Sequence, residues 1–305
     1  MSKNKLEQVQ EIKESLNDFS EKIFKLVGLD SETKIEVLSK QINDSIRRVK
    51  YVKYLTNAKI VHERMEPSSE LFDPLKAAVL MTRQGNIDEA CWLVFLAVHF
   101  GKHSKNKWRL VRKIYGKLGS SDHWCWNSIK GDLKAFSNWF NDNIRHFDNE
   151  RFSNHRKYES LKDTVKVLAS YVNWVQSCGG HDNMIRDIHR QVGQNPREVF
   201  DQLYKNMNKV TRFGRLAKFD YLTMLGKLGI FPIEPGSAYL KDNATGPIRG
   251  ARLLFEGDVN AQISPAKLEE LLKKIDDHLH VGMQVLEDSL CNWQKSPEVY
   301  TLFRG

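Results

Sequence analysis

The stretch VTRFGRLAKFDYLTMLGKLGIFPIEP, residues 210–235, decides the fold of the chain. Its apolar residues take helical spacing after Gly214, and the preceding helix is expected to end near Lys209. Two helices therefore meet at a short turn that leaves backbone N–H groups free at the start of the second helix. Three cations lie beside this turn: Arg212, Arg215 and Lys218. Because free amides and the positive end of a helix dipole both attract phosphate, the turn is a candidate phosphate site; the alternative is a helical corner with a solvated basic face.

The rest of the chain is patterned for helices as well. It has 305 residues, of which 41% are hydrophobic, including 15 Phe, 9 Tyr and 7 Trp. This is enough apolar surface for a sizeable core, and it excludes a mostly disordered protein. The apolar run from Ala90 to Phe100 predicts a buried helix, since it is shorter than the roughly 20 residues that cross a bilayer. No run of alternating β-branched residues precedes Ile230, so we expect a mainly α-helical fold.

The N-terminal residues 1–64 predict a helical hairpin. Apolar residues recur at spacings of three and four along residues 6–26 and again along residues 35–52. Such a heptad seam packs on another helix, either elsewhere in this chain or in a second copy that forms a homodimer with it. The turn Glu66-Pro67-Ser68-Ser69 marks the expected boundary to a catalytic domain at residues 65–305. Since the hairpin has no cluster of catalytic residue types, we expect it to be dispensable for chemistry.

The charge of the chain favours a polyanionic partner. Lys and Arg number 47 against 38 Asp and Glu, which gives a net charge of +9. The excess is regional: residues 101–158 contain 13 cations and 5 anions, residues 190–252 contain 11 and 5, and residues 255–305 contain 5 and 9. Nucleic acid is the commonest partner of a protein with basic regions. We therefore expect binding to double-stranded DNA and no association with a membrane.

The cysteine and histidine patterns indicate a cytoplasmic protein without a metal. The four cysteines are far apart and form no CxxC pair, which argues against a zinc ribbon or disulfide framework and fits a reducing compartment. The N-terminal segment is polar and lacks the apolar region of a signal peptide. His99 and His103 are four residues apart, but no third ligand is near them in the sequence. We expect neither a metal nor any other cofactor.

Residues 214–234 resemble the helix-hairpin-helix DNA glycosylases. The matching residues are Gly214-Arg215, Ala217, Leu222, Leu225-Gly226-Lys227 and Phe231-Pro232-Ile233, followed by Glu234. In that superfamily an acidic residue after this string acts at the glycosidic bond, and the resemblance implies this role for Glu234. The chain departs from the pattern in two ways. Thr211-Arg212-Phe213 stands where the first hairpin glycine would be, and glutamate replaces the usual aspartate.

A closer resemblance covers most of residues 65–305. The bacterial family labelled alpha-glutamyl/putrescinyl thymine pyrophosphorylase, third clade, is similar to this chain in WLVFLAVHFGKH, WRLVRKIYG, FGRLAKFDYLTMLGKLG, IEPGSAYLKDNATGPIRGARLLF and LEDSLCNWQKSP. That family is regarded as a divergent branch of the helix-hairpin-helix glycosylase fold, and its name comes from a proposed role in making hypermodified thymines of phage DNA. Related bacterial proteins are anti-phage glycosylases that remove hypermodified bases. The resemblance implies a protein that flips out and acts on modified bases in DNA, with base removal and base synthesis both open.

Two carboxylates, Glu234 and Asp220, are candidates for catalysis. Cleavage of a glycosidic bond needs an anionic carboxylate near the sugar, where it stabilises positive charge on C1′ or activates water. Glu234 follows a strand-like or loop Phe-Pro-Ile directly after a helix, which can hold it rigidly at the edge of a cleft. Asp220 lies in the middle of the helix that starts near Arg215, and its alternative role is a buried salt bridge to Arg215 or Lys218.

Further residues are candidates for a pocket around the base or its charged adduct. The first group contains His155, Arg156, Lys157 and Tyr158, with Tyr239 added from residues 210–255. These residues suit phosphates or a charged adduct; the alternative is a solvated basic turn. The second group contains Asn292, Trp293 and Gln294, where the indole can stack on a flipped base while the amides read its edge; the alternative is that this segment only packs the final helix. Arg249 is added to the DNA contacts.

These observations lead to one preferred function and two alternatives. The preferred function is a DNA glycosylase that flips out a hypermodified, phage-type base and cleaves its N-glycosidic bond, in defence against phage. The first alternative is a transferase or pyrophosphorylase that builds hypermodified thymine. The second is a catalytically inactive DNA-binding module whose carboxylates are structural. The three differ in the fate of the modified base, which is released, changed in mass or left as it was.

Overall fold

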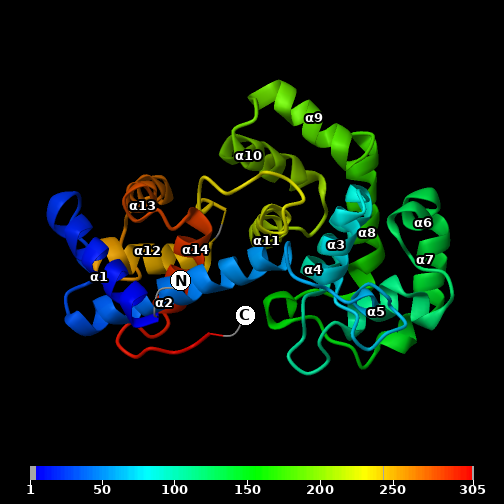
Figure 1. Cartoon of the computed structure of the whole chain (residues 1–305), viewed down its shortest axis with the longest axis horizontal. Coiled ribbons are helices and arrows are strands. Elements are labelled where there is room, and N and C mark those ends of the chain that lie inside the picture. Colours follow the sequence, from blue (N-terminus) through cyan, green and yellow to red (C-terminus); the bar gives the residue numbers. More distant parts are fainter. Residues whose placement is uncertain (1–4, 243, 304–305) are drawn as a thin grey trace. The chain divides into compact units, whose positions relative to one another are not determined.

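The computed structural model describes residues 5–242 and 244–303, and over these residues the protein is mainly α-helical, as predicted, with no β-strand (Figure 1). It divides into two compact units: Met1–Val52 with Pro235–Gly305, called unit 1, and Lys53–Glu234, called unit 2. No helix in the described part of the chain combines the length and apolarity needed to cross a membrane.

The α-helices of unit 1 come from both ends of the chain. They are α1 (Lys5–Lys22), α2 (Glu32–Leu55), whose residues from Lys53 onward are assigned to unit 2, α12 (Thr245–Glu256), α13 (Pro265–Leu279) and α14 (Met283–Trp293). Unit 2 contains α3 (Pro74–Arg83), α4 (Ile87–Phe100), α5 (Arg109–Tyr115), α6 (Trp126–Gly131), α7 (Leu133–Asp142), α8 (Thr164–Ser177), α9 (His181–Val192), α10 (Pro196–Asn206) and α11 (Arg215–Lys227). Short 3-10 turns in unit 2 are η1 (His62–Arg64), η2 (Lys117–Gly119), η3 (Ile144–Phe147), η4 (Asn154–Arg156), η5 (Leu161–Asp163) and η6 (Met207–Lys209).

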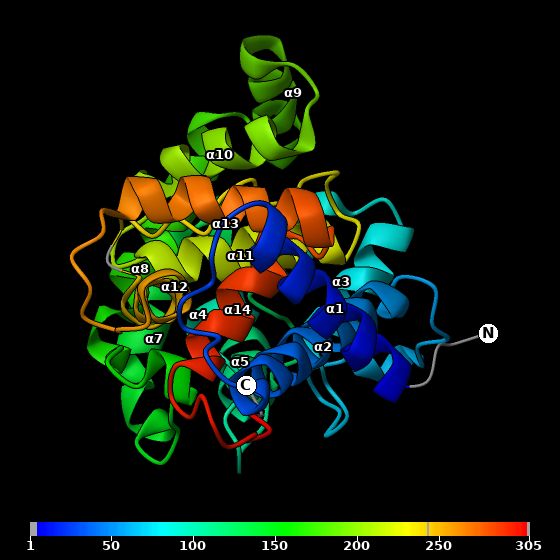
Figure 2. The same ribbon diagram turned by 90° about the vertical axis from the view of Figure 1, so that its left-hand side faces the viewer.

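The core of unit 1 joins the N-terminal helices to the C-terminal ones. Leu16 and Phe19 of α1 and Leu38 of α2 are buried in one apolar cluster with side chains of α12, α13 and α14. Figure 2 shows the ribbons of these helices. Helices α1 and α2 run antiparallel, as ion pairs of Lys5 with Asp44 and of Lys13 with Glu32 show. The chain itself therefore covers the predicted seam. Dimerisation stays a prediction, although the apolar seam that suggested it is covered by helices of this chain.

Two glycines allow the elements of unit 1 to approach closely. A Cβ atom on Gly28 would lie 1.8 Å from the carbonyl oxygen of Leu253, and a Cβ atom on Gly250 would lie 2.3 Å from that of Leu290. The N–H of Gly28 donates to the carbonyl of Leu254 at 3.0 Å. The loop after α1 is thus fixed to α12, and α12 is fixed to α14.

The compact units are divided after Val52 and after Glu234, and not at the boundary expected near Glu66. Residues 1–52 share their core with residues 235–305, whereas the turn Glu66–Ser69 lies within unit 2. A turn in the sequence marks a change of direction but carries no information on which distant segment completes a core. Removing the hairpin would therefore uncover the apolar faces of α12, α13 and α14.

Helix α4 forms the centre of unit 2, as its apolar sequence predicts. It is capped at its N-terminus by Asn86, whose side chain accepts a hydrogen bond from the N–H of Glu89, and at its C-terminus by Gly101, which has a φ of 68°. Trp92 and Phe95 of α4 are buried and stack on Tyr171 of α8. Helices α3, α9 and α11 pack against α4, so α11 is supported along its inner side.

The predicted helical corner is present in unit 2. Helix α10 is capped by Asn195, continues into η6 as far as Lys209, and is followed by α11 from Arg215. Residues 210–214 form the turn between them. This turn sets the start of α11 and, about one and a half helical turns further on, the position of Asp220.

Candidate active site

Arg212 joins the two segments of unit 2 in which the sequence places a site. Its Nε donates to Oε2 of Glu159 at 3.1 Å, and its Nη1 lies 3.6 Å from Oδ2 of Asp163. The carboxylate of Glu159 is only 4% exposed, so this ion pair is shielded on one side. Arg212 therefore fastens the turn before α11 to residues 158–163. No local pattern in the sequence indicates Glu159 as its partner.

Asp220 is the acid of this site that lacks a partner. Its side chain is half-buried, and the described residues provide it with no hydrogen bond and no ion pair, so the predicted salt bridge to Arg215 or Lys218 is not formed. Burial raises the pKa of Asp220 above its ordinary value. Four cations oppose that rise: Arg156, Lys227, His155 and Arg215. A half-buried, perturbed carboxylate among cations is typical of a functional site.

Arg156 is a buried cation that forms no ion pair with the described residues. It is 4% exposed, its Nε donates to the carbonyl of Val98 at 3.1 Å, and its guanidinium lies 5.6 Å from the centre of the Phe213 ring. Its Nη2 has no hydrogen-bond partner among the described residues. A buried charge is costly unless an opposite charge compensates it. Of the four cations near Asp220, Arg156 favours the charged carboxylate most, so these two groups stabilise each other's charge.

A buried hydrogen-bond chain lies behind Asp220 and fixes α11. Tyr221, the next residue, contacts the hydroxyl of Tyr171 at 2.7 Å; Nε2 of His181 lies 2.7 Å from Tyr171, and its Nδ1 lies 2.5 Å from Oδ1 of Asp88. Burial lowers the pKa of His181, and the hydrogen bond from His181 lowers the pKa of Asp88 to about 2. A neutral His181 then donates from Nδ1 to Asp88 and accepts from Tyr171. This satisfied network holds α11 in place from inside the unit.

In the turn between α10 and α11, Gly214 is accessible to solvent, whereas Lys218 in the first turn of α11 is buried. Gly214 is exposed, and a Cβ atom there would meet nothing within 4 Å. Lys218, which we predicted beside a phosphate, is only 5% exposed; its Nζ donates to Oδ1 of Asn208 at 2.7 Å and lies 4.0 Å from the centre of the Tyr204 ring. The structure gives Lys218 a packing role between α10 and α11. Arg215 is half-buried, with its guanidinium 5.2 Å from the centre of the Phe219 ring.

Glu234 lies at the surface, at the last residue of unit 2. Its Oε1 accepts a hydrogen bond from Nε of Arg197 at 3.1 Å, and its side chain is 58% exposed. The segment before it is irregular and is held close to α11, since a Cβ atom on Gly226 would lie 2.2 Å from the carbonyl oxygen of Ile233. Water screens an exposed, paired carboxylate. Within unit 2, Asp220 is therefore the better placed of the two predicted acids.

Exposed cations gather beside this site. His155, Lys157 and Tyr158 are exposed, as a basic turn would be. The loop 101–108 lies next to them, because the N–H of Ser153 donates to the carbonyl of Phe100 at 3.0 Å. That loop adds three exposed lysines: Lys102, Lys105 and Lys107. We call His155, Lys157 and these three lysines the basic surface of unit 2.

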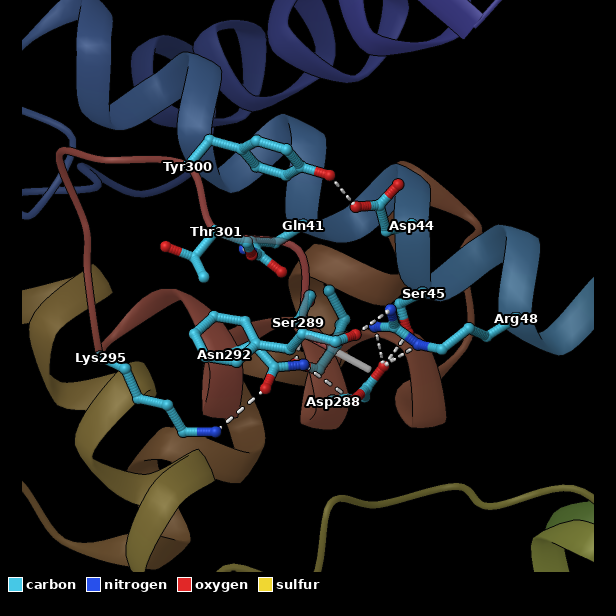
Figure 3. Close-up of polar contacts among 12 residues, drawn as sticks. Gln41, Asp44, Ser45, Arg48, Asp288, Ser289, Asn292, Lys295, Tyr300 and Thr301 are labelled. Carbon is cyan, nitrogen blue, oxygen red and sulfur yellow. Dashed lines mark hydrogen bonds and ion pairs between the residues drawn. The ribbon is translucent and has the colours of Figure 1, made fainter. Parts of the chain in front are cut away.

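The C-terminal candidates lie in unit 1, where a polar network engages Asn292 (Figure 3). Asp288 accepts hydrogen bonds from Ser45 at 2.7 Å, from Arg48 at 2.5 Å and from Asn292 at 3.1 Å. The amide oxygen of Asn292 accepts from Nζ of Lys295 at 3.1 Å. Two further hydrogen bonds connect α2 to the C-terminal segment, one from Tyr300 to Asp44 and one from Gln41 to the carbonyl of Thr301. Together these contacts fix the C-terminal segment on α2.

The other predicted residues of unit 1 have different surroundings. Trp293 is fully buried in the core of unit 1, which matches the packing alternative rather than stacking on a base. Nε2 of Gln294 donates to the carbonyl of Cys291 at 3.2 Å. Arg249 is exposed on α12, and Tyr239 is half-buried with a left-handed φ of 53°. Their roles in DNA and base binding stay predictions.

The histidines singled out in the sequence are not brought together with other ligands. His99 is buried, and burial together with the charge of Arg156 lowers its pKa to about 3. Nδ1 of His103 accepts a hydrogen bond from the N–H of Asn106 in the loop 101–108. Over residues 5–242 and 244–303, no three His, Cys, Asp or Glu side chains are arranged to hold a metal ion.

Over the described residues, the fold and the site define an all-α protein in which a carboxylate without an ion pair lies near cations at a helical corner. The chain belongs to the family described as alpha-glutamyl/putrescinyl thymine pyrophosphorylase clade 3, whose family model matches residues 33–305. The name of the family designates enzymes that act on modified thymine, and this chain is related to them. No curated protein and no solved structure matches the chain.

Proposed function

We propose that this protein is a DNA glycosylase that acts on hypermodified bases, with Asp220 as its catalytic carboxylate. The observation that carries the proposal is the state of Asp220, whose side chain is half-buried, has no hydrogen-bond or ion-pair partner among the described residues, and has its charged form favoured by Arg156, Lys227, His155 and Arg215. A carboxylate tied into an ion pair would have to lose its partner before it could act on a sugar. Asp220 needs no such rearrangement.

The proposed reaction uses a target nucleotide that is flipped out of the duplex. As the bond between C1′ and the base nitrogen breaks, positive charge develops on the sugar, and the Asp220 carboxylate stabilises it. Water then adds to C1′, and one proton of that water goes to the departing base. The products are free base and an abasic site. Loss of bases from incoming phage DNA would serve as defence, and we include this role in the proposal.

A transferase or pyrophosphorylase reaction is the second candidate, and the family name favours it. An enzyme that builds hypermodified thymine by displacing pyrophosphate must hold a strongly anionic leaving group. The cations around Asp220 would suit that group as well as they suit DNA phosphates. In this case the carboxylate would act as a base toward the incoming amine.

One experiment separates these reactions. The protein is incubated with DNA that carries a modified thymine, and both the free bases and the mass of the base in the strand are measured. Released base with an abasic site supports the glycosylase. Released pyrophosphate with a changed base mass supports the transferase, and neither change means that the chain only binds DNA.

Binding of duplex DNA is expected to weaken steeply with salt, because each neutralised phosphate releases counterions. Lys105→Gln combined with Lys157→Gln should lower the slope of log affinity against log salt by about 1.8, since each phosphate contact contributes about 0.9. The measurement is affinity for unmodified duplex over a salt series. Lys273→Gln, which removes an exposed lysine of α13 in unit 1, is the control and should keep the wild-type slope. A flat salt dependence of the wild-type protein would contradict DNA binding through this basic surface.

Arg156→Met should move the acidic limb of the pH profile of kcat/KM to higher pH. Catalysis requires ionised Asp220, so the rate falls as pH drops through the pKa of this group in the free enzyme. Arg156 lowers that pKa, and its removal lets the pKa rise. Arg156→Lys keeps a positive charge and should stay near the wild-type profile. The same limb position in the Met variant would mean that Arg156 does not act on Asp220.

A further inference from the structure

Exposed tyrosines and uncompensated cations lie together on the second half of α2. Tyr51 is 60% exposed and Tyr54 is 66% exposed, although large aromatic side chains are usually covered. Residues 46–59 contain five Lys or Arg and no Asp or Glu. Of these cations, Arg48 pairs with Asp288. Arg47, Lys50 and Lys53 are exposed, and the described part of the chain gives them no ion pair.

Helix geometry aligns four of these residues. With about 100° of rotation per residue, Arg47, Lys50, Tyr51 and Tyr54 fall within an arc of about 100°, and Lys53 lies about 60° beyond it. Along the axis the two tyrosines are about 4.5 Å apart, at 1.5 Å of rise per residue. Since α2 is one unbroken helix (Figure 1), its own backbone fixes this spacing. We call these four residues the α2 stripe.

We propose that the α2 stripe binds a single-stranded segment of nucleic acid. Exposed aromatic rings offer faces on which unpaired bases stack, and cations beside them follow the phosphates. Exposed aromatic rings beside cations are complementary to the bases and phosphates of a single nucleic-acid strand and are poorly suited to other partners. A membrane surface needs a broad apolar face, but the stripe offers only two tyrosines, and Val49 and Val52 are turned partly inward.

The stripe is independent of the carboxylate site. It contains none of the residues assigned to catalysis, and its chemistry requires only exposed bases and phosphates. Unpaired bases are present wherever a duplex is opened, as it is around a flipped nucleotide. The inference therefore shares with the proposed function the expectation of a nucleic-acid partner, but not the reaction.

The test compares full-length variants in binding to a labelled oligo-dT single strand by fluorescence anisotropy. Tyr51→Ala with Tyr54→Ala should weaken binding by about tenfold or more, the scale of losing base stacking. Tyr51→Phe with Tyr54→Phe retains the rings and should stay within about threefold of wild type. Lys50→Gln should lower the salt slope by about 0.7, the value for one contact to a single strand. Leu71→Ala, which trims another exposed apolar side chain, is the control and should have no effect.

Several outcomes would overturn the inference. The first is unchanged affinity for oligo-dT in the double alanine variant. The second is that the variant loses binding to anionic lipid vesicles but not to DNA. The third is that the variant has a lower molecular mass in solution than the wild-type protein, which would show that the tyrosines join two copies of the chain. The assay also separates this inference from the proposed function. If the alanine variant loses single-strand binding while the wild-type protein releases no modified base, the role of the α2 stripe is supported and the glycosylase function is refuted. If the wild-type protein releases modified bases but the alanine variant binds single strands normally, the glycosylase function is supported and the role of the stripe is refuted.

Discussion

Asp220→Asn is expected to lower base release by roughly two orders of magnitude or more, the scale for loss of one preorganised electrostatic group. Asparagine keeps the shape of the side chain and removes its charge, so cationic character on C1′ is no longer stabilised. Release of base from modified DNA in a single turnover is the measurement. Affinity for DNA should stay level or rise, because a negative charge near the phosphates has been removed.

The thermal stability of Asp220→Asn provides an independent test of the same assignment. Burial raises the pKa of Asp220 in the folded protein above its pKa in the unfolded chain. The ionised carboxylate therefore destabilises the native state at pH values above the folded-state pKa. This destabilisation disappears once the pH falls below the pKa of the unfolded chain. Replacing it with a neutral amide should leave the melting temperature unchanged or higher at neutral pH. An active site that opposes stability shows this combination of lost activity and retained fold.

Glu234→Gln is the matched control. Its carboxylate is exposed and paired with Arg197, and surface pairs contribute little to stability. Under the proposal, this variant should retain most of its activity. If Glu234→Gln abolishes base release and Asp220→Asn does not, the resemblance to the glycosylase string identifies the acid correctly and Asp220 is structural. If both variants remain folded and active, neither carboxylate is catalytic.

The sequence predicts the helices of this protein well because their signals are local. The apolar run of α4, the caps of α10 and the turn before Arg215 depend on residues a few positions apart. Helical periodicity identifies which side of a helix is apolar. It does not identify the helix against which that side packs, so the joining of α1 and α2 to α12, α13 and α14 could not be deduced.

The site was predictable as a set of residues but not as an arrangement. Asp220 and Arg156 were both candidates, yet their proximity depends on how residues 152–161 return to α11. The sequence could not show that Lys218 is buried against Tyr204, because that contact depends on the angle between α10 and α11. The α2 stripe is hidden in the sequence for a different reason. Its residues share a helix with a heptad seam that indicates packing, and the five cations without an acid in residues 46–59 do not reveal which side chains are exposed.

Deleting residues 1–64 is expected to abolish cooperative unfolding of unit 1. Seven apolar side chains of this segment are buried in its core: Ile12, Leu16, Phe19, Leu26, Val37, Leu38 and Ile42. At about 1.5–3 kcal/mol for each buried side chain, their loss removes on the order of 10–20 kcal/mol. The net stability of a domain is about 5–15 kcal/mol. The apolar faces of α12, α13 and α14 would then be exposed to water.

This outcome differs from what the sequence alone suggests for the hairpin, which carries no catalytic residue types. The truncated protein should aggregate or bind a dye for exposed apolar surface, and calorimetry should show the loss of a transition. Leu16→Asp is a point version of the same change, since Leu16 is 1% exposed and a charge there has no partner in the core. Ile23→Ser lies beyond the end of α1 and is 49% exposed, so it should leave unfolding unchanged. A truncated chain that melts cooperatively at the wild-type temperature would show that α12, α13 and α14 form a core without the N-terminal helices.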